Sequence, residues 1–284
     1  MSDSQELVAT DAPASYAPEE QPFQTVMVDL THRCNMGCHN CYIPNREIPD
    51  MDAEWLYDML ALFPTRTRIR LVGAEPTMRE DLEAIVARVR RLGHLPILMS
   101  NGLKLASRAY ANRLKRAGLR TVYLSLNGGS NDDFYEQIDG LRCARSKQTA
   151  FDNLCAENFY LSLGMILVRG INETEFLPLY QKSMERRQVY ELHVRSIGKM
   201  GRHMDSDSFT MEEMVTMCAE AIGLDRKPHL DACAGQTSYE FKTGRLKVQF
   251  TEWPDMGSST RGRLGPDGRV YPFFEHMLAN EGGY

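Results

Sequence analysis

The sequence predicts an α/β fold in which strands and helices alternate along most of the chain. The first observation is that short apolar runs alternate with longer amphipathic segments up to about residue 195. The second is that several amphipathic segments end at glycines, as at Gly93 and Gly118. Six strand–helix repeats at this spacing predict a parallel sheet with helices outside it. Such sheets curl, so we expect a partial (β/α)6 TIM-like barrel followed by a small α+β C-terminal extension.

The expected elements follow the chain in order. The expected strands cover residues 25–30, 68–72, 96–100, 121–126, 162–168 and 191–195. The expected helices cover residues 53–62, 79–92, 107–117, 148–159, 174–187 and 211–222. Asp52 and Thr210 stand at the N-cap positions of the first and last helix, where their side chains can accept a hydrogen bond from the first turn. Since the carboxyl ends of parallel strands meet at one rim, motifs that follow the strands should lie together.

Composition and charge narrow the class of protein. The chain has 284 residues, 43% hydrophobic and 25% charged, as in an ordinary globular protein. Its net charge of -5 gives no reason to expect nucleic acid or a membrane as partner, and no apolar run is long enough to span a bilayer. Residues 1–22 are acidic and rich in Ser, Ala and Pro, so we expect a disordered tail. They lack the features of a signal peptide. Seven cysteines, an odd number, then favour a cytoplasmic protein with metal chemistry over disulfides.

Three cysteines at CxxxCxxC spacing, Cys34, Cys38 and Cys41, follow the first expected strand. Thiolates at short loop spacings bind soft metals and iron–sulfur clusters. Three ligands fill three corners of a four-iron cluster and leave one iron open, and an open position distinguishes a reactive metal site from a structural one. Gly37 is expected to let the loop fold back, so that the three sulfurs converge.

Four further motifs follow the later strands. They are Gly73-Ala74-Glu75-Pro76, Ser100-Asn101-Gly102, Ser125-Leu126-Asn127-Gly128 and the segment that begins at Ile166. Each motif is weak alone, because turns that contain glycine are common. Their order along the chain, together with the cysteine triple, makes residues 25–202 resemble the radical S-adenosylmethionine (radical SAM) superfamily.

The resemblance implies a binding site for S-adenosylmethionine (SAM). In the family the GGEP motif meets the methionyl amino group of SAM, and the segment that here contains Ser125 and Asn127 lies near the ribose and carboxylate. The chain departs from the family pattern at Ala74, at Asn127 and at Asn40, which stands where the family usually has an aromatic residue beside adenine. Contact with adenine there is expected to be polar or to come from Tyr42. The residues expected to contact SAM are Asn40, Tyr42, Gly73, Ala74, Glu75, Pro76, Ser100, Asn101, Ser125, Asn127, Ile166 and Arg195.

The sixth expected strand ends in a basic segment. Arg195, together with Arg169 after the fifth strand, is expected near the SAM carboxylate or an anionic group of the substrate. A guanidinium forms bidentate pairs with carboxylates, which is why this residue type fits that role. A solvated basic loop is the alternative.

The resemblance also implies a reaction. In the family the amino and carboxylate groups of SAM chelate the open iron, and the reduced cluster passes one electron into the S–C5′ bond. The products are methionine and a 5′-deoxyadenosyl radical, which abstracts a hydrogen atom from the substrate. The implied cofactors are one [4Fe–4S] cluster and SAM, and the implied electron donor is a protein such as flavodoxin or ferredoxin.

Residues 204–284 are similar to the SPASM/twitch extension of some radical SAM enzymes, whereas residues 23–203 form the expected barrel domain. That extension normally binds auxiliary clusters, but here Gln249 and Phe273 stand where two of its cysteines are expected. One remaining thiol, Cys233, cannot hold a four-iron cluster, so we expect no auxiliary cluster. Cys233 is then a buried core residue without a function, a contact in the active site, or a hydrogen donor to a substrate radical. Tyr271, in a segment that could cap the barrel, is a second catalytic candidate.

The missing cysteines favour a redox-neutral or reductive outcome, such as epimerisation, decarboxylation or dehydration. Because no peptide-recognition domain fits before residue 25, we expect a small-molecule substrate in a specialised biosynthetic pathway. A ribosomally made peptide, with a separate leader-binding partner, is the alternative. A hypothesis from another class is a non-catalytic zinc or redox-sensing protein, in which His32 or His39 completes the cysteine site and the SAM motifs are accidental.

Overall fold

Six parallel strands form the centre of the fold. The computed structural model describes residues 15–41, 43, 45–197, 208–224, 231–233, 238–252 and 261–272. Each central strand pairs in parallel with the next one along the chain, and most of their residues are buried, as in a sheet covered on both faces. The strands are β1 Thr25–Asp29, β2 Arg68–Val72, β3 Leu95–Ser100, β4 Thr121–Ser125, β5 Tyr160–Ile166 and β6 Val189–Arg195. All six predicted strands are therefore present.

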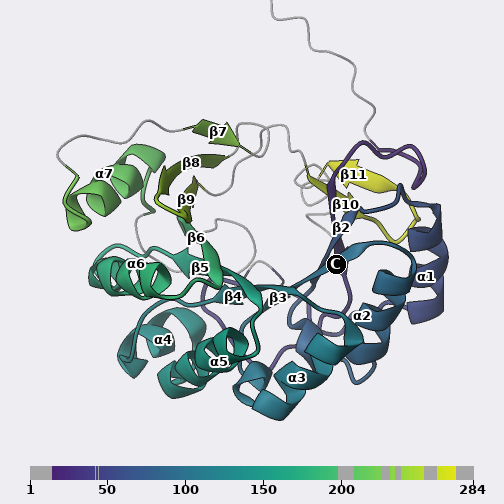
Figure 1. Ribbon diagram of the computed structural model, residues 1–284, viewed down its shortest axis with the longest axis horizontal. Coiled ribbons are helices and arrows are strands. Elements are labelled where there is room, and N and C mark those ends of the chain that lie inside the picture. The colour runs from purple at the N-terminus through teal and green to yellow at the C-terminus, as the bar shows by residue number, and fades with distance from the viewer. Residues whose placement is uncertain are drawn as a thin grey trace, which may run out of the picture.

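Further strands extend this sheet on both sides. They are β7 Asp231–Cys233, β8 Ser238–Thr243, β9 Leu246–Thr251, β10 Arg261–Leu264 and β11 Val270–Pro272. β9 runs parallel to β6 and β10 runs parallel to β1, so the C-terminal part of the chain contributes to both sides of the barrel. Among the described residues the strand order is β11-β10-β1-β2-β3-β4-β5-β6-β9-β8-β7, which leaves β11 and β7 as edges (Figure 1). The predicted partial barrel is confirmed.

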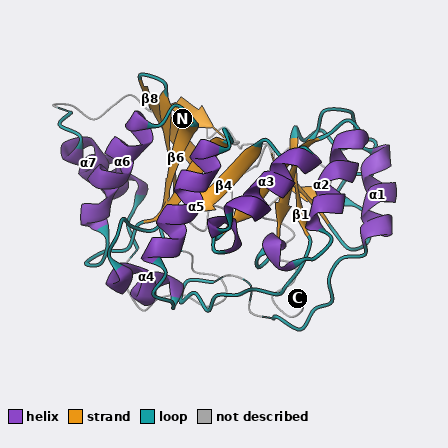
Figure 2. Cartoon of the chain, turned by 60° about the horizontal axis from the view of Figure 1, so that its bottom comes forward, coloured by secondary structure: helices purple, strands orange, loops and turns teal. Residues whose placement is uncertain are grey.

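A layer of helices covers the convex side of the sheet. The α-helices of the described residues are α1 Ala53–Leu62, α2 Leu82–Arg91, α3 Arg108–Ala117, α4 Asp132–Asp139, α5 Ala144–Ala156, α6 Phe176–Glu185 and α7 Met211–Ala221. Helices α1, α2, α3 and α5 lie in a row across the strands (Figure 2), and the main apolar core fills the space between the two layers. Asp52 accepts a hydrogen bond from the Trp55 N–H at 2.8 Å, and Thr210 forms a capping box with Glu213. Both predicted N-caps are confirmed.

The segment between β4 and β5 differs from the prediction. The expected helix 148–159 is observed as α5, which begins at Ala144, and α4 precedes it. Gly140 ends α4 in the left-handed conformation, at a φ of 68°. Helix α4 has only eight residues, which is shorter than the window over which a helical periodicity can be recognised. β5 also ends earlier than expected, because the Asn172 side chain binds the Ile166 carbonyl at 2.8 Å and the Val168 N–H at 2.8 Å.

Part of the expected N-terminal tail contacts the C-terminal strands. The backbone of Tyr16 exchanges hydrogen bonds with that of Val270 at 2.8 and 2.9 Å, and its ring packs edge-on against Phe23. The division into a barrel domain and an extension at residue 203 stays a prediction. None of the helices in the described ranges is long and apolar enough to cross a bilayer.

Candidate active site

A cavity of about 230 Å³ lies inside the barrel, at the carboxyl ends of the strands. Alternate strand residues, such as Arg70 and Val72 of β2, line it together with the loop that follows β1. Alternate residues of a strand point to the same face, so this lining is the inner face of the barrel. The predicted site residues that line the cavity are Cys34, Cys38, Asn40, Cys41, Gly73, Ala74, Glu75, Ser100, Asn101, Ser125, Asn127, Ile166 and Arg195.

Two predicted residues that the structure describes do not line this cavity. Pro76 is buried in the turn beside it. Tyr271 lies on β11, where its hydroxyl donates a hydrogen bond to Asp267 at 2.5 Å. Tyr42 and the side chain of Cys233 lie outside the described residues. Roles in catalysis for Cys233 and Tyr271 therefore stay predictions.

The two basic residues that were expected to act together are separated. Arg195 lines the cavity. Arg169 instead pairs with Glu213 at 2.9 Å, and its guanidinium lies 4.2 Å from the centroid of the Phe209 ring. The Arg169 and Glu213 side chains are 41% and 46% exposed. For Arg169 the structure supports the alternative of a solvated position, because helix α7 offers this arginine a partner on the surface.

The loop of the three cysteines packs against the end of α4. The His39 N–H donates to the Ile138 carbonyl at 3.0 Å, and His39 Nδ1 lies 2.8 Å from the Gln137 carbonyl oxygen. The loop is thereby held over the cavity. Burial, followed by the nearby carboxylate of Asp139, raises the pKa of the Cys38 thiol to about 12. Such a thiol loses its proton readily only when a metal takes its place.

The cysteine geometry fits a cluster better than a single ion. In the part of the chain that the structure describes, no three His, Cys, Asp or Glu side chains can hold one metal ion. A zinc ion draws its ligands to about 2.0–2.3 Å around one centre, whereas each thiolate of a four-iron cluster binds its own iron. Three thiols that line one cavity suit the second arrangement. The donor set therefore fits a [4Fe–4S] cluster.

The turn that follows β2 joins it to the end of β3. Glu75 is 1% exposed, and its carboxylate accepts hydrogen bonds from Ser100 Oγ at 2.9 Å and from the Asn101 N–H at 2.7 Å. Gly73 has a φ of 125°, and an added Cβ would lie 2.3 Å from the Thr31 carbonyl oxygen, so glycine is required there. Because the Glu75 carboxylate is engaged within the fold, the turn offers a ligand mainly its backbone.

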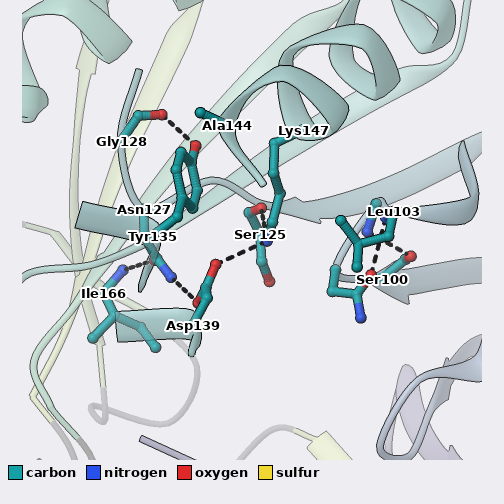
Figure 3. A network of polar contacts seen from close by, with 12 residues as sticks. Ser100, Leu103, Ser125, Asn127, Gly128, Tyr135, Asp139, Ala144, Lys147 and Ile166 are labelled. Carbon is teal, nitrogen blue, oxygen red and sulfur yellow. Dashed lines mark hydrogen bonds and ion pairs between the residues drawn. The ribbon is translucent and has the colours of Figure 1, made fainter. Parts of the chain in front are cut away.

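A buried ion pair supports the ends of β4 and β5 (Figure 3). Lys147 is fully buried, and its Nζ lies 3.1 Å from Asp139 Oδ2 and donates to the Ser125 carbonyl at 3.1 Å. Asp139 Oδ1 accepts from Asn127 Nδ2 at 2.8 Å, and Asn127 Oδ1 accepts from the Ile166 N–H at 2.9 Å. Burial lowers the pKa of Lys147, but the charge of Asp139 and other nearby groups outweigh it and raise this pKa. The ammonium group is therefore charged at neutral pH.

A second set of lining residues is cationic. Arg70, Arg195 and Arg261, which we call the arginine cluster, line the cavity together with His193 and Tyr123. The Nε atoms of Arg70 and Arg195 are buried and have no hydrogen-bond partner among the described residues. Burial, and then the charges of the three arginines, lowers the pKa of His193 well below its ordinary value. Burial and the neighbouring guanidinium groups together keep this imidazole neutral, and the guanidinium contribution indicates a positive site.

Several of these residues were missed from the sequence. A signal for Arg70 and Arg261 exists, since each belongs to a pair of arginines two apart in a short strand, and such spacing places both on one face. No comparable signal exists for Lys147 and Asp139. They lie on different helices, on either side of the turn at Gly140, and no periodicity connects them.

Comparison with known proteins places the chain in a family. Residues 28–183, more than half of the chain, match the model of the Radical SAM superfamily. The chain is 31% identical over 172 residues to 7,8-dihydro-6-hydroxymethylpterin dimethyltransferase of Methanocaldococcus jannaschii, which covers 57% of this chain and 34% of that protein. It is 22% identical over 271 residues to GTP 3',8-cyclase of Staphylococcus aureus, which covers 88% of this chain and 78% of the cyclase. It thus spans about a third of the methyltransferase.

Solved structures agree on the fold. The chain superposes on Streptococcus suis SuiB bound to S-adenosylmethionine with a TM-score of 0.60 and 12% identity, over 88% of this chain and 60% of SuiB. With SuiB bound to its precursor peptide SuiA the TM-score is 0.62 at 11% identity, over 93% and 62%. Because the family model covers more than half of the chain, the chain belongs to the Radical SAM superfamily, whose members use a [4Fe–4S] cluster and SAM.

Proposed function

We propose that this enzyme generates a 5′-deoxyadenosyl radical and uses it on an anionic small molecule held by the arginine cluster. Cys34, Cys38 and Cys41 hold the cluster in this proposal. The observation that carries the choice of substrate is the pair of unpartnered, buried Nε atoms on Arg70 and Arg195. A buried N–H donor without an acceptor costs about 1–3 kcal/mol, and more on a charged group, so an anion is the natural ligand at this place.

The charges of the lining support an anionic ligand. Five cationic side chains line the cavity, against two carboxylates. The Asp139 carboxylate forms an ion pair with Lys147, and the Glu75 carboxylate accepts hydrogen bonds from Ser100 and Asn101. The cations are Arg46, Arg70, Lys147, Arg195 and Arg261.

Two nearby carboxylates are paired with cations outside the arginine cluster. Glu191 pairs with Lys247 at 2.6 Å, and Asp29 pairs with Arg263 at 2.6 Å. A ligand with a carboxylate or phosphate group would take the remaining positive charge, since guanidinium groups bind both in bidentate fashion. The likeness to an enzyme whose name includes GTP supports a small anionic substrate.

The remaining lining suits radical chemistry. When bound, the cluster and SAM supply the radical; the protein positions it and keeps water away. Met27, Val72, Met99 and Ile166 give the cavity an apolar part, which suits the adenosyl group. The residues predicted to contact SAM remain our proposal for its binding site, with Asn40 beside adenine. We also propose the predicted redox-neutral or reductive outcome and the absence of an auxiliary cluster.

A radical SAM enzyme needs a reductant as well as a substrate, and we propose flavodoxin or ferredoxin as the electron donor. We also propose a cytoplasmic location, because the three thiols must stay reduced to bind iron. The described cysteines are all free thiols, which is consistent with a reducing compartment. A peptide substrate remains an outcome of the test below.

The test screens pools of nucleotides, phosphate esters, carboxylic acids, neutral metabolites and peptides for faster formation of 5′-deoxyadenosine by the reconstituted enzyme. We expect the active pool to be anionic. Once the active compound of that pool is identified, Arg70→Met should raise its KM by about 10- to 100-fold, the range for loss of one charge-assisted hydrogen bond. Arg68→Gln is the matched control, because Arg68 is exposed on the same strand and does not line the cavity.

Two results would contradict the proposed substrate class. The first is activity with a neutral compound or a peptide only. The second is a KM for the anionic compound that Arg70→Met and Arg68→Gln leave equally unchanged.

A further inference from the structure

We propose that Arg46 sets the reduction potential of the cluster through a hydrogen bond to the sulfur of Cys41. The inference rests on the proposed function, since it takes Cys41 as a cluster ligand. Arg46 lies outside the motifs that relate the chain to its family. Its role comes from its position in the loop between β1 and α1.

The Arg46 guanidinium reaches into the cavity from the cysteine loop. Its Nη2 lies 3.0 Å from Cys41 Sγ, in the position of a hydrogen-bond donor. Its Nη1 is buried and has no hydrogen-bond partner among the described residues. Arg46 and Cys41 both line the same cavity. One arm of the guanidinium therefore contacts a sulfur, while the other remains available to an anionic group of a bound ligand.

Cys41 differs from the other two cysteines in this respect. The side-chain donor at Cys34 is Asn101, whose Nδ2 lies 3.9 Å from the sulfur and also donates to Asn35 Oδ1 at 2.8 Å, and the Met36 backbone N–H is a second neutral donor. An amide at that distance is a weak, neutral donor. Cys41 instead has a charged donor at close range, and charge-assisted hydrogen bonds are roughly twice as strong as neutral ones.

A hydrogen bond to a ligand sulfur favours the reduced cluster. Reduction adds one negative charge, part of which resides on the sulfur atoms, and a positive donor stabilises that charge. Hydrogen bonds to the sulfurs are among the factors that set cluster potentials. Arg46 should therefore make the cluster easier to reduce by the electron donor. It acts through Cys41 as a positioning residue, without taking part in bond cleavage.

The test is a redox titration followed by electron paramagnetic resonance, on anaerobically reconstituted protein without SAM. Arg46→Met and Arg46→Gln should each shift the midpoint potential to a more negative value than that of the wild type. Arg46→Lys, which keeps the charge and a donor, should restore most of the wild-type potential. Arg33→Gln is the control, because Arg33 belongs to the same loop but pairs with Asp50 at the surface.

The possible results distinguish failure of the role proposed for Arg46 from failure of the proposed function. Equal potentials for the wild type, Arg46→Met and Arg46→Gln would overturn the role of Arg46. So would an equal shift in Arg33→Gln, since the effect would then be one of net charge. If Arg46→Met fails to assemble a cluster, the midpoint potential of Arg46→Gln alone decides whether Arg46 has this role. Absence of any cluster signal in the wild type would overturn the proposed function itself.

Discussion

The cavity contains two sets of polar groups that differ in how far the protein itself satisfies them. The first set, which we call the paired network, includes Glu75, Asn127, Asp139 and Lys147, each with hydrogen bonds or an ion pair inside the protein. The arginine cluster is the second set, and two of its Nε atoms are buried without a partner. A satisfied network is rigid before any ligand arrives and suits a cofactor in a fixed position. Two cationic donors without an acceptor suit a substrate that supplies an anionic group.

The largest effect is expected when the paired network is broken. Asp139→Asn leaves the Lys147 ammonium buried without its carboxylate, which should lower the free energy of unfolding by about 3–5 kcal/mol. Urea denaturation measures this loss. Asp133→Asn is the matched control, because the ion pair of Asp133 with Arg142 lies on the surface and should contribute little. Equal losses in the two variants would mean that the network is not a rigid support.

The lowered pKa of His193, which lies beside the arginine cluster, should make the stability of the protein depend on pH. The folded protein lowers the pKa of His193, so at neutral pH this imidazole is uncharged both before and after unfolding. Below the ordinary pKa of 6.5 only the unfolded chain takes up the proton, and stability should fall by about 1.4 kcal/mol per pH unit. The loss should continue until the pH reaches the lowered folded pKa.

The measurement compares wild type and His193→Gln by urea denaturation between pH 7.5 and 5.5. Other groups, such as Asp50 and Asp81 with their lowered pKa values, contribute equally to both proteins. The difference between the two curves therefore isolates the imidazole. Parallel curves would show that the arginine cluster exerts no strong field at His193.

The smallest effect is expected at Arg169. This residue pairs with Glu213 at the surface and does not line the cavity. Arg169→Gln should leave both the KM for substrate and the affinity for SAM unchanged. A rise of tenfold or more in either constant, measured beside Arg195→Gln, would mean that the loop after β5 moves into the cavity during the reaction.

The sequence was sufficient for the parts of the site that local patterns encode. The strand ends, the cysteine loop and the motif residues from Gly73 to Ile166 were found because each is a short segment with its own spacing. Thirteen of the predicted residues line a single cavity for this reason. Their roles as cluster ligands and SAM contacts still await experiment.

The sequence was insufficient where the site depends on packing between distant segments. Lys147 and Asp139 meet because Gly140 ends α4 and lets α5 turn back, and that helix was not predicted. The two positions considered for Arg169 could not be distinguished, because its partner Glu213 lies on a helix far along the chain. The arginine cluster combines β2, β6 and β10, which are not neighbours in the sheet and contribute to one site only because the sheet curves around the cavity.

The measurement that tests the account most directly is an iron count, with an assay for 5′-deoxyadenosine, on anaerobically reconstituted protein supplied with SAM and a strong reductant. The wild type and Cys218→Ala, whose cysteine is buried in α7, should each hold about four irons per chain and form 5′-deoxyadenosine. Cys38→Ala should form none. Retention of SAM cleavage in Cys38→Ala, or its absence in the wild type, would contradict the account. About eight irons per chain would show that the C-terminal segment binds a second cluster.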